Sequence, residues 1–266
     1  MNSRSRPPAV AGTFYPDNPK TLRNDVLQYI SDAKTINGPR PKFLIAPHAG
    51  YIYSGSTAAY AYRYIKSYAE DITRVVLMGP AHRVALSGLA IPSMSQFSSP
   101  LGNINLDEKN LEKLEALDFV SIDDTAHALE HSLEVQLPFL QSVLNEFTLT
   151  PIVVGECSPK ELAILINTLW GGDETLFICS TDLSHYHAYS DAKQIDATTC
   201  DKIKNGENNI SGEQACGCYP LNGVLQVAQE RHLEVKQLYY CNSGDTAGAQ
   251  DAVVGYGAFI IGNSQQ

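Results

Sequence analysis

The sequence contains no run of about 18 uncharged apolar residues, the length that a transmembrane helix needs. No apolar stretch of the kind found in secretory signals follows residues 1–8. Lysine and arginine form no cluster, and the 266 residues carry a formal net charge of −10. Nucleic-acid binding depends on clustered cations, so this balance argues against it. We expect a cytoplasmic protein that neither spans a membrane nor binds nucleic acid.

The six cysteines show neither the rhythm of a disulfide scaffold nor a CxxC spacing. The nearest pair lies in Cys216-Gly217-Cys218, which we interpret as part of a buried loop before a helix. We read the cysteines mostly as free thiols. The GxSxG motif of serine hydrolases is also absent, which argues against nucleophilic-serine chemistry.

Apolar residues recur in patterns that predict an α/β fold. Residues 18–33 and 130–144 have apolar side chains at helical spacing, and residues 50–55 read as a loop. Residues 149–154 and 175–179 are nearly continuous apolar runs, typical of strands covered on both faces. With 44% hydrophobic residues, the chain can bury one large core. We expect a single domain over residues 1–266, with helices flanking a central, mostly parallel sheet.

Histidines follow three of the predicted strands. Residues 43–46 lead to His48, residues 75–78 lead to His82, and residues 176–179 lead to Asp182 and His185. The carboxyl ends of parallel strands share one edge of a sheet, where ligands bind. Neutral imidazole suits iron, zinc or copper, and it titrates near neutral pH. A transition-metal site at this edge is therefore the leading hypothesis.

The loops that carry these histidines allow a structural reading as well. Pro47 and Gly50 bracket His48, which would hold its ring at a turn, as suits a ligand or a histidine that caps a strand end. Asp182 lies three residues before His185 and could fix its tautomer for proton transfer. The alternative is an aspartate that caps a helix, with a surface histidine behind it.

The segment Glu130-His131-Ser132-Leu133-Glu134 places two carboxylates four residues apart, on one helical face. It is not the HExxH signature of zinc proteases. His131 could lie beside the site as a hydrogen-bond donor. Taken alone, the two carboxylates are better interpreted as a solvated face.

A loop after residue 241 offers a third metal ligand beside two histidines. Its candidates are Cys241, Asp245 and Thr246. Two histidines and a carboxylate favour non-haem Fe(II), whereas two histidines and a cysteine favour zinc or copper. The sequence leaves both open.

Several motifs together resemble the Memo family over nearly the whole chain. They lie at residues 6–16, 47–51, 79–82, 130–134, 182–185 and 242–245. The resemblance implies a fold like that of the class III extradiol dioxygenases, an α/β sandwich around a mixed central sheet with a non-haem iron site. It also implies that His48 and His82 are metal ligands, and that His131, Asp182 and His185 line the same pocket.

The resemblance bears on the third ligand and on partners too. Animal members use a cysteine in the C-terminal loop, and Thr246 stands at the matching position here, with Asp245 adjacent and Cys241 upstream. Bacterial and archaeal relatives are associated with a radical-SAM protein and a third small protein. Animal relatives are described as binding phosphotyrosine peptides and handling copper or iron.

Three functions follow as hypotheses. The first is an Fe(II)-dependent oxidoreductase, with copper or zinc as alternative metals, in which His185 moves the proton. The second is a binding module for a peptide or small ligand, with a pocket lined by Tyr51, Tyr186 and the histidines. The third is metal-assisted hydrolysis, since a bound metal can lower the pKa of water toward neutrality.

Overall fold

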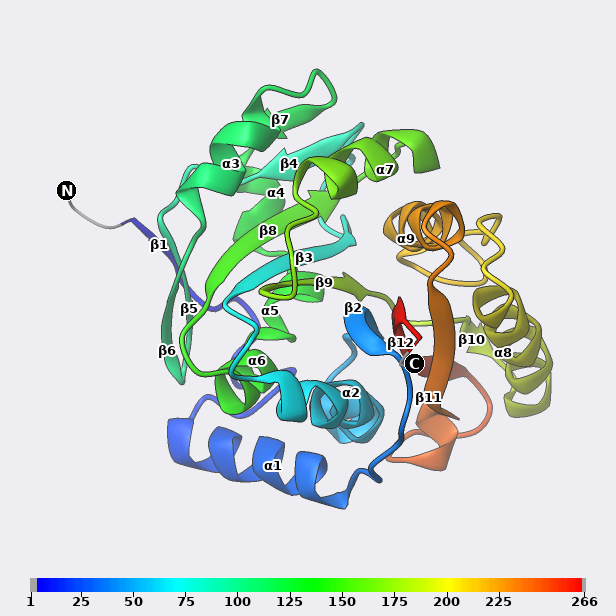
Figure 1. Ribbon diagram of the computed structural model, residues 1–266. Coiled ribbons are helices and arrows are strands. Elements are labelled where there is room, and N and C mark those ends of the chain that lie inside the picture. The colour runs from blue at the N-terminus through cyan, green and yellow to red at the C-terminus, as the bar shows by residue number, and fades with distance from the viewer. Residues whose placement is uncertain (1–3, 265–266) are drawn as a thin grey trace.

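A nine-stranded sheet forms the centre of the molecule, and helices cover both of its faces (Figure 1). The computed structural model describes residues 4–264. The strands of this sheet are β2 (Arg40–Ala46), β3 (Arg74–Pro80), β4 (Leu89–Ile91), β7 (Val120–Ile122), β8 (Thr148–Val154), β9 (Thr175–Ser180), β10 (His185–His187), β11 (Glu234–Asn242) and β12 (Val253–Asn263).

The sheet is parallel at its centre and antiparallel toward one side. Its strand order is β10-β12-β2-β9-β3-β8-β4-β7, and β11 also pairs with β12. Strands β2, β9, β3 and β8 run parallel, whereas β12 is antiparallel to β2, β10 and β11. At the other end, β4 is antiparallel to β8 and parallel to β7. The predicted α/β class, with a mixed sheet flanked by helices, is confirmed.

The N-terminal segment joins a second, three-stranded sheet. Strand β1 (Ser5–Arg6) pairs in parallel with β5 (Gln96–Ser99), which continues antiparallel into β6 (Gly102–Asn105). This pairing places Arg6 opposite Phe97, which is distant from it in the sequence.

Two layers of helices cover the central sheet. On one face lie α1 (Pro19–Asp32), α2 (Tyr51–Ile65), α4 (Asp124–Ala128), α5 (His131–Glu134) and α6 (Leu137–Val143). On the other lie α3 (Glu108–Glu115), α7 (Pro159–Thr168), α8 (Tyr189–Lys204) and α9 (Cys218–Glu230). Short 3₁₀ turns, η1 (Lys66–Tyr68) and η2 (Ser243–Asp245), follow α2 and β11.

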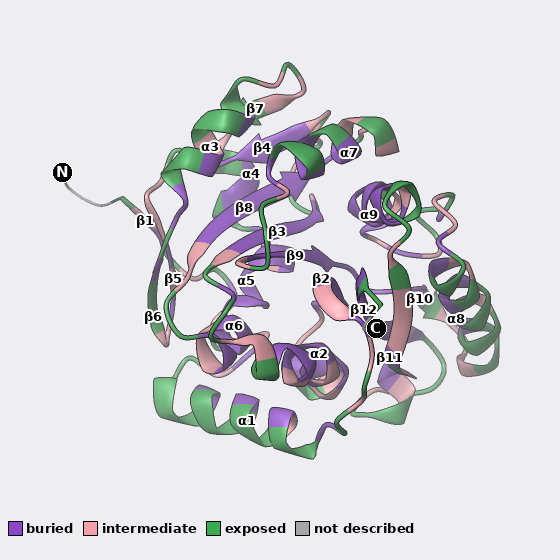
Figure 2. Cartoon of the chain, viewed as in Figure 1, coloured by how far each residue is buried: buried purple, intermediate pink, exposed green. Residues whose placement is uncertain are grey.

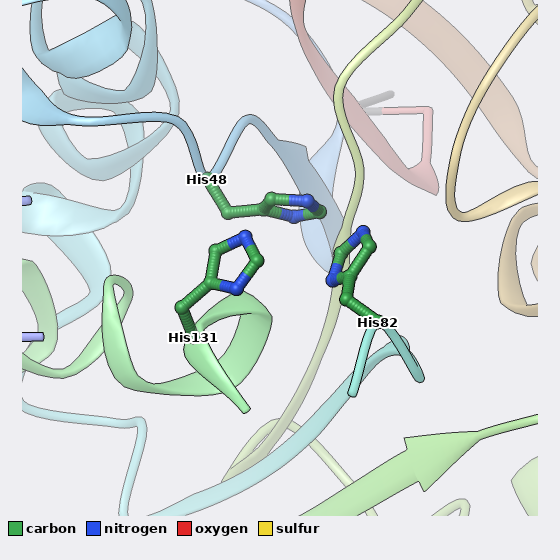
Figure 3. Close-up of side chains that lie close together, drawn as sticks. All are labelled: His48, His82 and His131. Carbon is green, nitrogen blue, oxygen red and sulfur yellow. The ribbon is translucent and has the colours of Figure 1, made fainter. Parts of the chain in front are cut away.

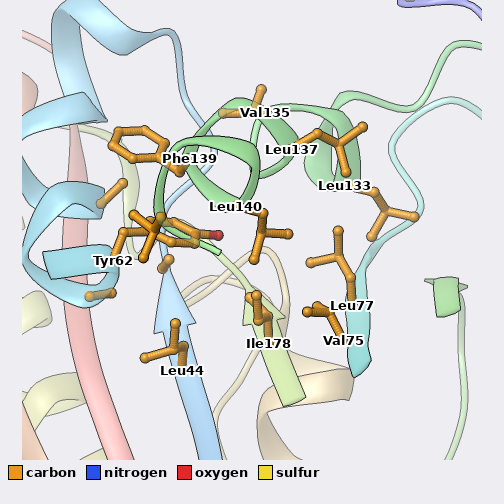
Figure 4. Packing of buried hydrophobic residues seen from close by; sticks show 14 of the residues in the cluster. Leu44, Tyr62, Val75, Leu77, Leu133, Val135, Leu137, Phe139, Leu140 and Ile178 are labelled. Atoms are coloured by element: carbon orange, nitrogen blue, oxygen red, sulfur yellow. The ribbon is translucent and has the colours of Figure 1, made fainter. Parts of the chain in front are cut away.

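Each face of the sheet packs its own hydrophobic core, because side chains alternate along a strand. In β2, Leu44 and Ala46 pack under α2 and α6, and Phe43 and Ile45 belong to the opposite core. Figure 2 shows the central strands mostly buried, with intermediate exposure at the start of β2. Figure 4 shows the first core, where Leu44 and Tyr62 lie among aliphatic side chains from α6 and the strands.

One predicted helix is confirmed, and two predicted elements differ from the structure. The helix predicted over residues 18–33 is α1, capped by the Asn18 side chain with Pro19 at its first position. The predicted loop 50–55 is wrong, because helix α2 begins at Tyr51 directly after Gly50. The helix predicted over residues 130–144 is two helices, and Pro138 lies in the first turn of α6, where a missing N–H costs little.

Within residues 4–264, no helix combines the length and the apolar content that crossing a bilayer requires.

Candidate metal centre

Strand order brings two of the predicted histidines together. Strands β2 and β3 lie on either side of β9, so their carboxyl ends open onto the same edge. His48 follows β2 and His82 follows β3, each after one intervening residue. Their ring centroids are 5.1 Å apart, with the planes nearly perpendicular.

A third imidazole completes the group. His131, the first residue of α5, lies 5.4 Å from His48 and 4.6 Å from His82 between ring centroids. One ligand atom from each ring lies within 4.8 Å of the other two, which is a spacing that can hold a metal ion. Figure 3 shows the three rings converging from separate segments of the chain.

Helix α5 reaches this position because it approaches β3 closely. Ser132 Oγ donates a hydrogen bond to the carbonyl of Pro80 at 3.0 Å. A Cβ added at Gly79 would come within 2.7 Å of the same oxygen, so only glycine fits there. The contact fixes His131 beside the end of β3.

Hydrogen bonds determine which nitrogen of His48 is free. Ser180 Oγ donates its one proton to the carbonyl of Ser132 at 2.6 Å, so it must accept from its other neighbours. His48 Nδ1, 2.9 Å from that oxygen, therefore carries the proton and donates it. The lone pair of His48 is left on Nε2.

A buried carboxylate determines which ring nitrogen of His82 is free. Glu130 Oε1 lies 2.9 Å from His82 Nδ1, and Glu130 Oε2 accepts from the His82 backbone N–H. Burial alone would raise the pKa of Glu130, but these bonds and the His82 charge lower it to about 2. The ionised carboxylate orients the ring, as is common for metal-binding histidines, and frees Nε2.

His131 is neutral and has an unpaired nitrogen. Its Nδ1 is buried and makes no hydrogen bond, although Glu130 Oε1 lies 3.5 Å away. Its ring packs against Phe14, with centroids 4.7 Å apart. Burial, together with the charges of His48 and His82, lowers the pKa of His131 to about 4.

The donor set fits a borderline transition metal. Burial lowers the pKa of His48 as well, so His48 and His131 are both neutral at pH 7 and offer lone pairs. Three imidazoles suit iron, zinc, copper or nickel rather than magnesium or calcium, which prefer oxygen ligands. His48 is buried and the His82 side chain is 27% exposed, so the group is reached from the His82 side.

Asp182 lies beside this group. Its Oδ1 accepts from the His48 backbone N–H at 2.7 Å, and its Oδ2 is 3.9 Å from His48 Nε2. Burial raises the pKa of Asp182, and the charge of His185 opposes that rise. His185, the first residue of β10, is half-buried and lies edge-on to Tyr186. The structure thus places Asp182 beside His48, with His185 close enough for its charge to act on Asp182.

The structure does not bring Asp245 or Cys241 into the group of ligand atoms, so neither matches its expected position as third ligand. Asp245 is exposed, and its carboxylate accepts hydrogen bonds from Tyr189 and from the backbone of Asn242 at the start of η2. Cys241 is buried, with Sγ 3.0 Å from Thr57 Oγ1 in α2. Local hydrogen bonds hold both side chains in place.

The predicted pocket tyrosines are also placed elsewhere. Tyr51 is buried in the first hydrophobic core, where its hydroxyl donates to the carbonyl of Val135, because α2 begins there. Tyr186 is 78% exposed and has a positive φ of 62°. Thr246 is exposed, and its hydroxyl donates to the carbonyls of Tyr53 and Ser243.

Two parts of the site escaped sequence reasoning. The predicted solvated face is wrong, because Glu130 and Glu134 are 1% and 0% exposed. Glu130 is the partner of His82, 48 positions earlier in the sequence, and no local spacing signals that contact. Cys216, read as part of a buried loop, has its sulfur 3.4 Å from His48 Nε2, and its distance in sequence gave no signal.

Comparison with known proteins gives a consistent family. The family model described as "Memo-like protein" matches residues 6–260. A "MEMO1 family protein" of Methanosarcina mazei is 34% identical, covering 96% of this chain and 98% of the relative. Those of Aquifex aeolicus and Sulfolobus acidocaldarius are 33% and 32% identical, covering 97% and 94% of this chain and 99% and 97% of their own lengths.

One solved structure is similar in fold. The crystal structure of an uncharacterized protein from Escherichia coli K12 aligns with a TM-score of 0.52 and 13% identity. It covers 83% of this chain and 100% of the other chain. At this identity, the similarity extends to the fold alone.

Proposed function

Because the chain belongs to the Memo-like protein family, we propose that its three histidines hold a transition-metal ion. We propose Fe(II) as the preferred ion and a metal-dependent oxidoreductase as the function. The observation that carries the proposal is the convergence of His48, His82 and His131 within 4.8 Å. A bound Fe(II) would supply one-electron chemistry and open coordination positions for dioxygen or a substrate.

The residues around the group have separate tasks in this proposal. Glu130 and Ser180 hold the rings of His82 and His48 in the tautomers that present Nε2. The partly exposed side chain of His82 marks the entrance for substrate, and buried His48 closes the inner side.

Asp182 and His185 are placed to move a proton. Burial favours the protonated form of Asp182, whereas the nearby His185 charge favours the ionised form. We assign proton transfer to Asp182 Oδ2, 3.9 Å from His48 Nε2, with His185 as the exchange partner toward solvent.

Metal analysis after anaerobic purification tests the proposal. We expect about one iron per chain, lost in His48→Ala and His131→Ala but retained in the control His232→Asn. His232 lies outside the group, and asparagine tolerates its positive φ of 54°. A wild-type chain that holds no stoichiometric metal, and takes none up on titration, would refute it.

Oxygen uptake then separates the possible uses of the ion. Oxygen consumption with a reducing substrate supports the oxidoreductase, and product release without oxygen consumption indicates metal-assisted hydrolysis. Ligand binding that survives loss of both His48 and His82 indicates a binding module instead. Association with a radical-SAM protein stays a prediction, which co-purification would test.

A further inference from the structure

The backbone of Cys216 is held against the inner side of the histidine group. It lies in the loop before α9, where its backbone N–H donates to the carbonyl of Asp182. The next residue, Gly217, donates its N–H to Thr181 Oγ1 at 2.9 Å. An added Cβ at Gly217 would come within 2.7 Å of the Thr181 side chain, so the loop packs directly on the exit of β9.

The sulfur faces the one nitrogen of His48 that carries a lone pair. Cys216 Sγ is 3.4 Å from His48 Nε2. Metal–nitrogen and metal–sulfur bonds of about 2.0 and 2.3 Å, at angles between 90° and tetrahedral, separate the two ligand atoms by about 3.0 to 3.5 Å. The observed separation lies within that range.

One hydrogen-bond donor near the sulfur suits a thiolate. The Asp182 backbone N–H donates to Cys216 Sγ at 3.3 Å, whereas the Thr181 hydroxyl gives its proton to the carbonyl of Asp182. A hydrogen bond of this kind stabilises negative charge on sulfur. Without a metal, burial raises the pKa of the Cys216 thiol, which donates to the carbonyl of Asp182 at 3.7 Å and gives up this bond on ligation. The other cysteines lack this placement: Cys241 is paired with Thr57, and Cys179 is buried in the second core.

We propose that Cys216 is a fourth protein ligand of the metal ion and supplies a thiolate next to His48. This inference rests on the proposed function. Cys216 is not a member of the group whose atoms all lie within 4.8 Å, so ligation requires its side chain to turn toward His82 and His131. As the metal–sulfur bond forms, the thiol proton leaves to the buffer.

A thiolate changes which ions the site prefers. Soft sulfur beside imidazole favours iron, zinc and copper and excludes manganese and magnesium more strongly than three imidazoles do. The thiolate also donates electron density, which stabilises the oxidised state of a redox metal. A six-coordinate ion would keep open positions, so the assignment is compatible with an oxidoreductase.

Cobalt(II) titration under anaerobic, reducing conditions tests the assignment. We expect wild-type protein to show visible d–d bands together with a near-ultraviolet sulfur-to-cobalt charge-transfer band. In Cys216→Ser the charge-transfer band is lost while cobalt still binds, at least about tenfold more weakly. Cys216→Ala serves as a second variant, and circular dichroism establishes that both are folded. The matched controls Cys241→Ser and Cys179→Ala keep the band.

X-ray absorption at the zinc edge tests independently whether Cys216 is a ligand. A sulfur shell at about 2.3 Å should be present in zinc-loaded wild type and absent in Cys216→Ser. Cobalt bound without the charge-transfer band, or a band that persists in Cys216→Ser, overturns the ligand assignment and leaves the proposed function standing. Failure of wild type to bind cobalt overturns both.

Discussion

Replacing Arg6 by alanine should destabilise the protein more than replacing any surface arginine. The guanidinium donates from Nη1 to Glu134 at 2.6 Å, from Nε to the carbonyl of His127 at 2.7 Å, and from Nη2 to the carbonyl of Glu130 at 2.7 Å. The side chains of Arg6 and Glu134 are 1% and 0% exposed. Arg6 thereby ties strand β1 to the segment that carries His131.

The size of the effect follows from the charge left behind. Breaking a buried ion pair by removing one partner costs about 3–5 kcal/mol. Glu134 would keep its hydrogen bonds from the backbone of Ala9 and Val10 and from the Tyr15 hydroxyl, which places the loss near the lower bound, about 3 kcal/mol. That is a large part of the 5–15 kcal/mol typical of a domain.

Urea denaturation, followed by the fluorescence of the single tryptophan, measures the loss. The control is Arg40→Ala, whose partners Asp71 and Asp173 are 53% and 71% exposed, and we expect a loss of about 0–1 kcal/mol there. Arg6→Met combined with Glu134→Gln should recover most of the stability, because no buried charge remains. A loss in Arg6→Ala no larger than in Arg40→Ala would refute the reasoning.

Three further predictions concern the site and its support. Glu130→Gln should weaken cobalt binding about 10- to 100-fold by calorimetry, because it loosens His82, and unchanged affinity would contradict this role. Burial lowers the pKa of His127 from 6.5 to about 4, so as the pH falls the unfolded chain binds a proton before the folded chain does. The contribution of His127 to the free energy of unfolding is therefore fully present above pH 6.5. It falls by at most about 3 kcal/mol as the pH drops to 4. Urea curves at pH 7 and 5 check this, and His127→Asn should remove that part of the dependence. Gly79→Ala should lower stability by about 1–3 kcal/mol in thermal unfolding, and a neutral result would show that helix α5 yields freely.

The sequence was informative wherever local pattern and sheet topology decide the outcome. Apolar runs that end in His48 and His82 predicted a shared edge, and the structure places their strands on either side of β9. The helical spacing of apolar residues over 18–33 predicted α1, because a helical repeat is a local pattern.

The remaining parts depend on contacts distant in sequence. Glu134 looks like a surface carboxylate in the sequence, because its ion-pair partner Arg6 lies 128 positions earlier. Asp245 and Cys241 looked like ligands because they follow a strand, but partners in α8 and α2 turn them elsewhere. No spacing rule links Cys216 to His48, 168 positions earlier.

The three histidines come from segments separated by 34 positions, 82 minus 48, and by 49 positions, 131 minus 82. The unfolded chain therefore offers no chelate, and an ion seated among them acts as a reversible cross-link between remote parts of the polypeptide. By mass action, free metal at 100 times its dissociation constant would add about 2.7 kcal/mol to the folded state. Under the proposed function, depletion of the metal in a cell would therefore remove the activity of the protein and also shorten its lifetime, because the folded state is less stable without the ion.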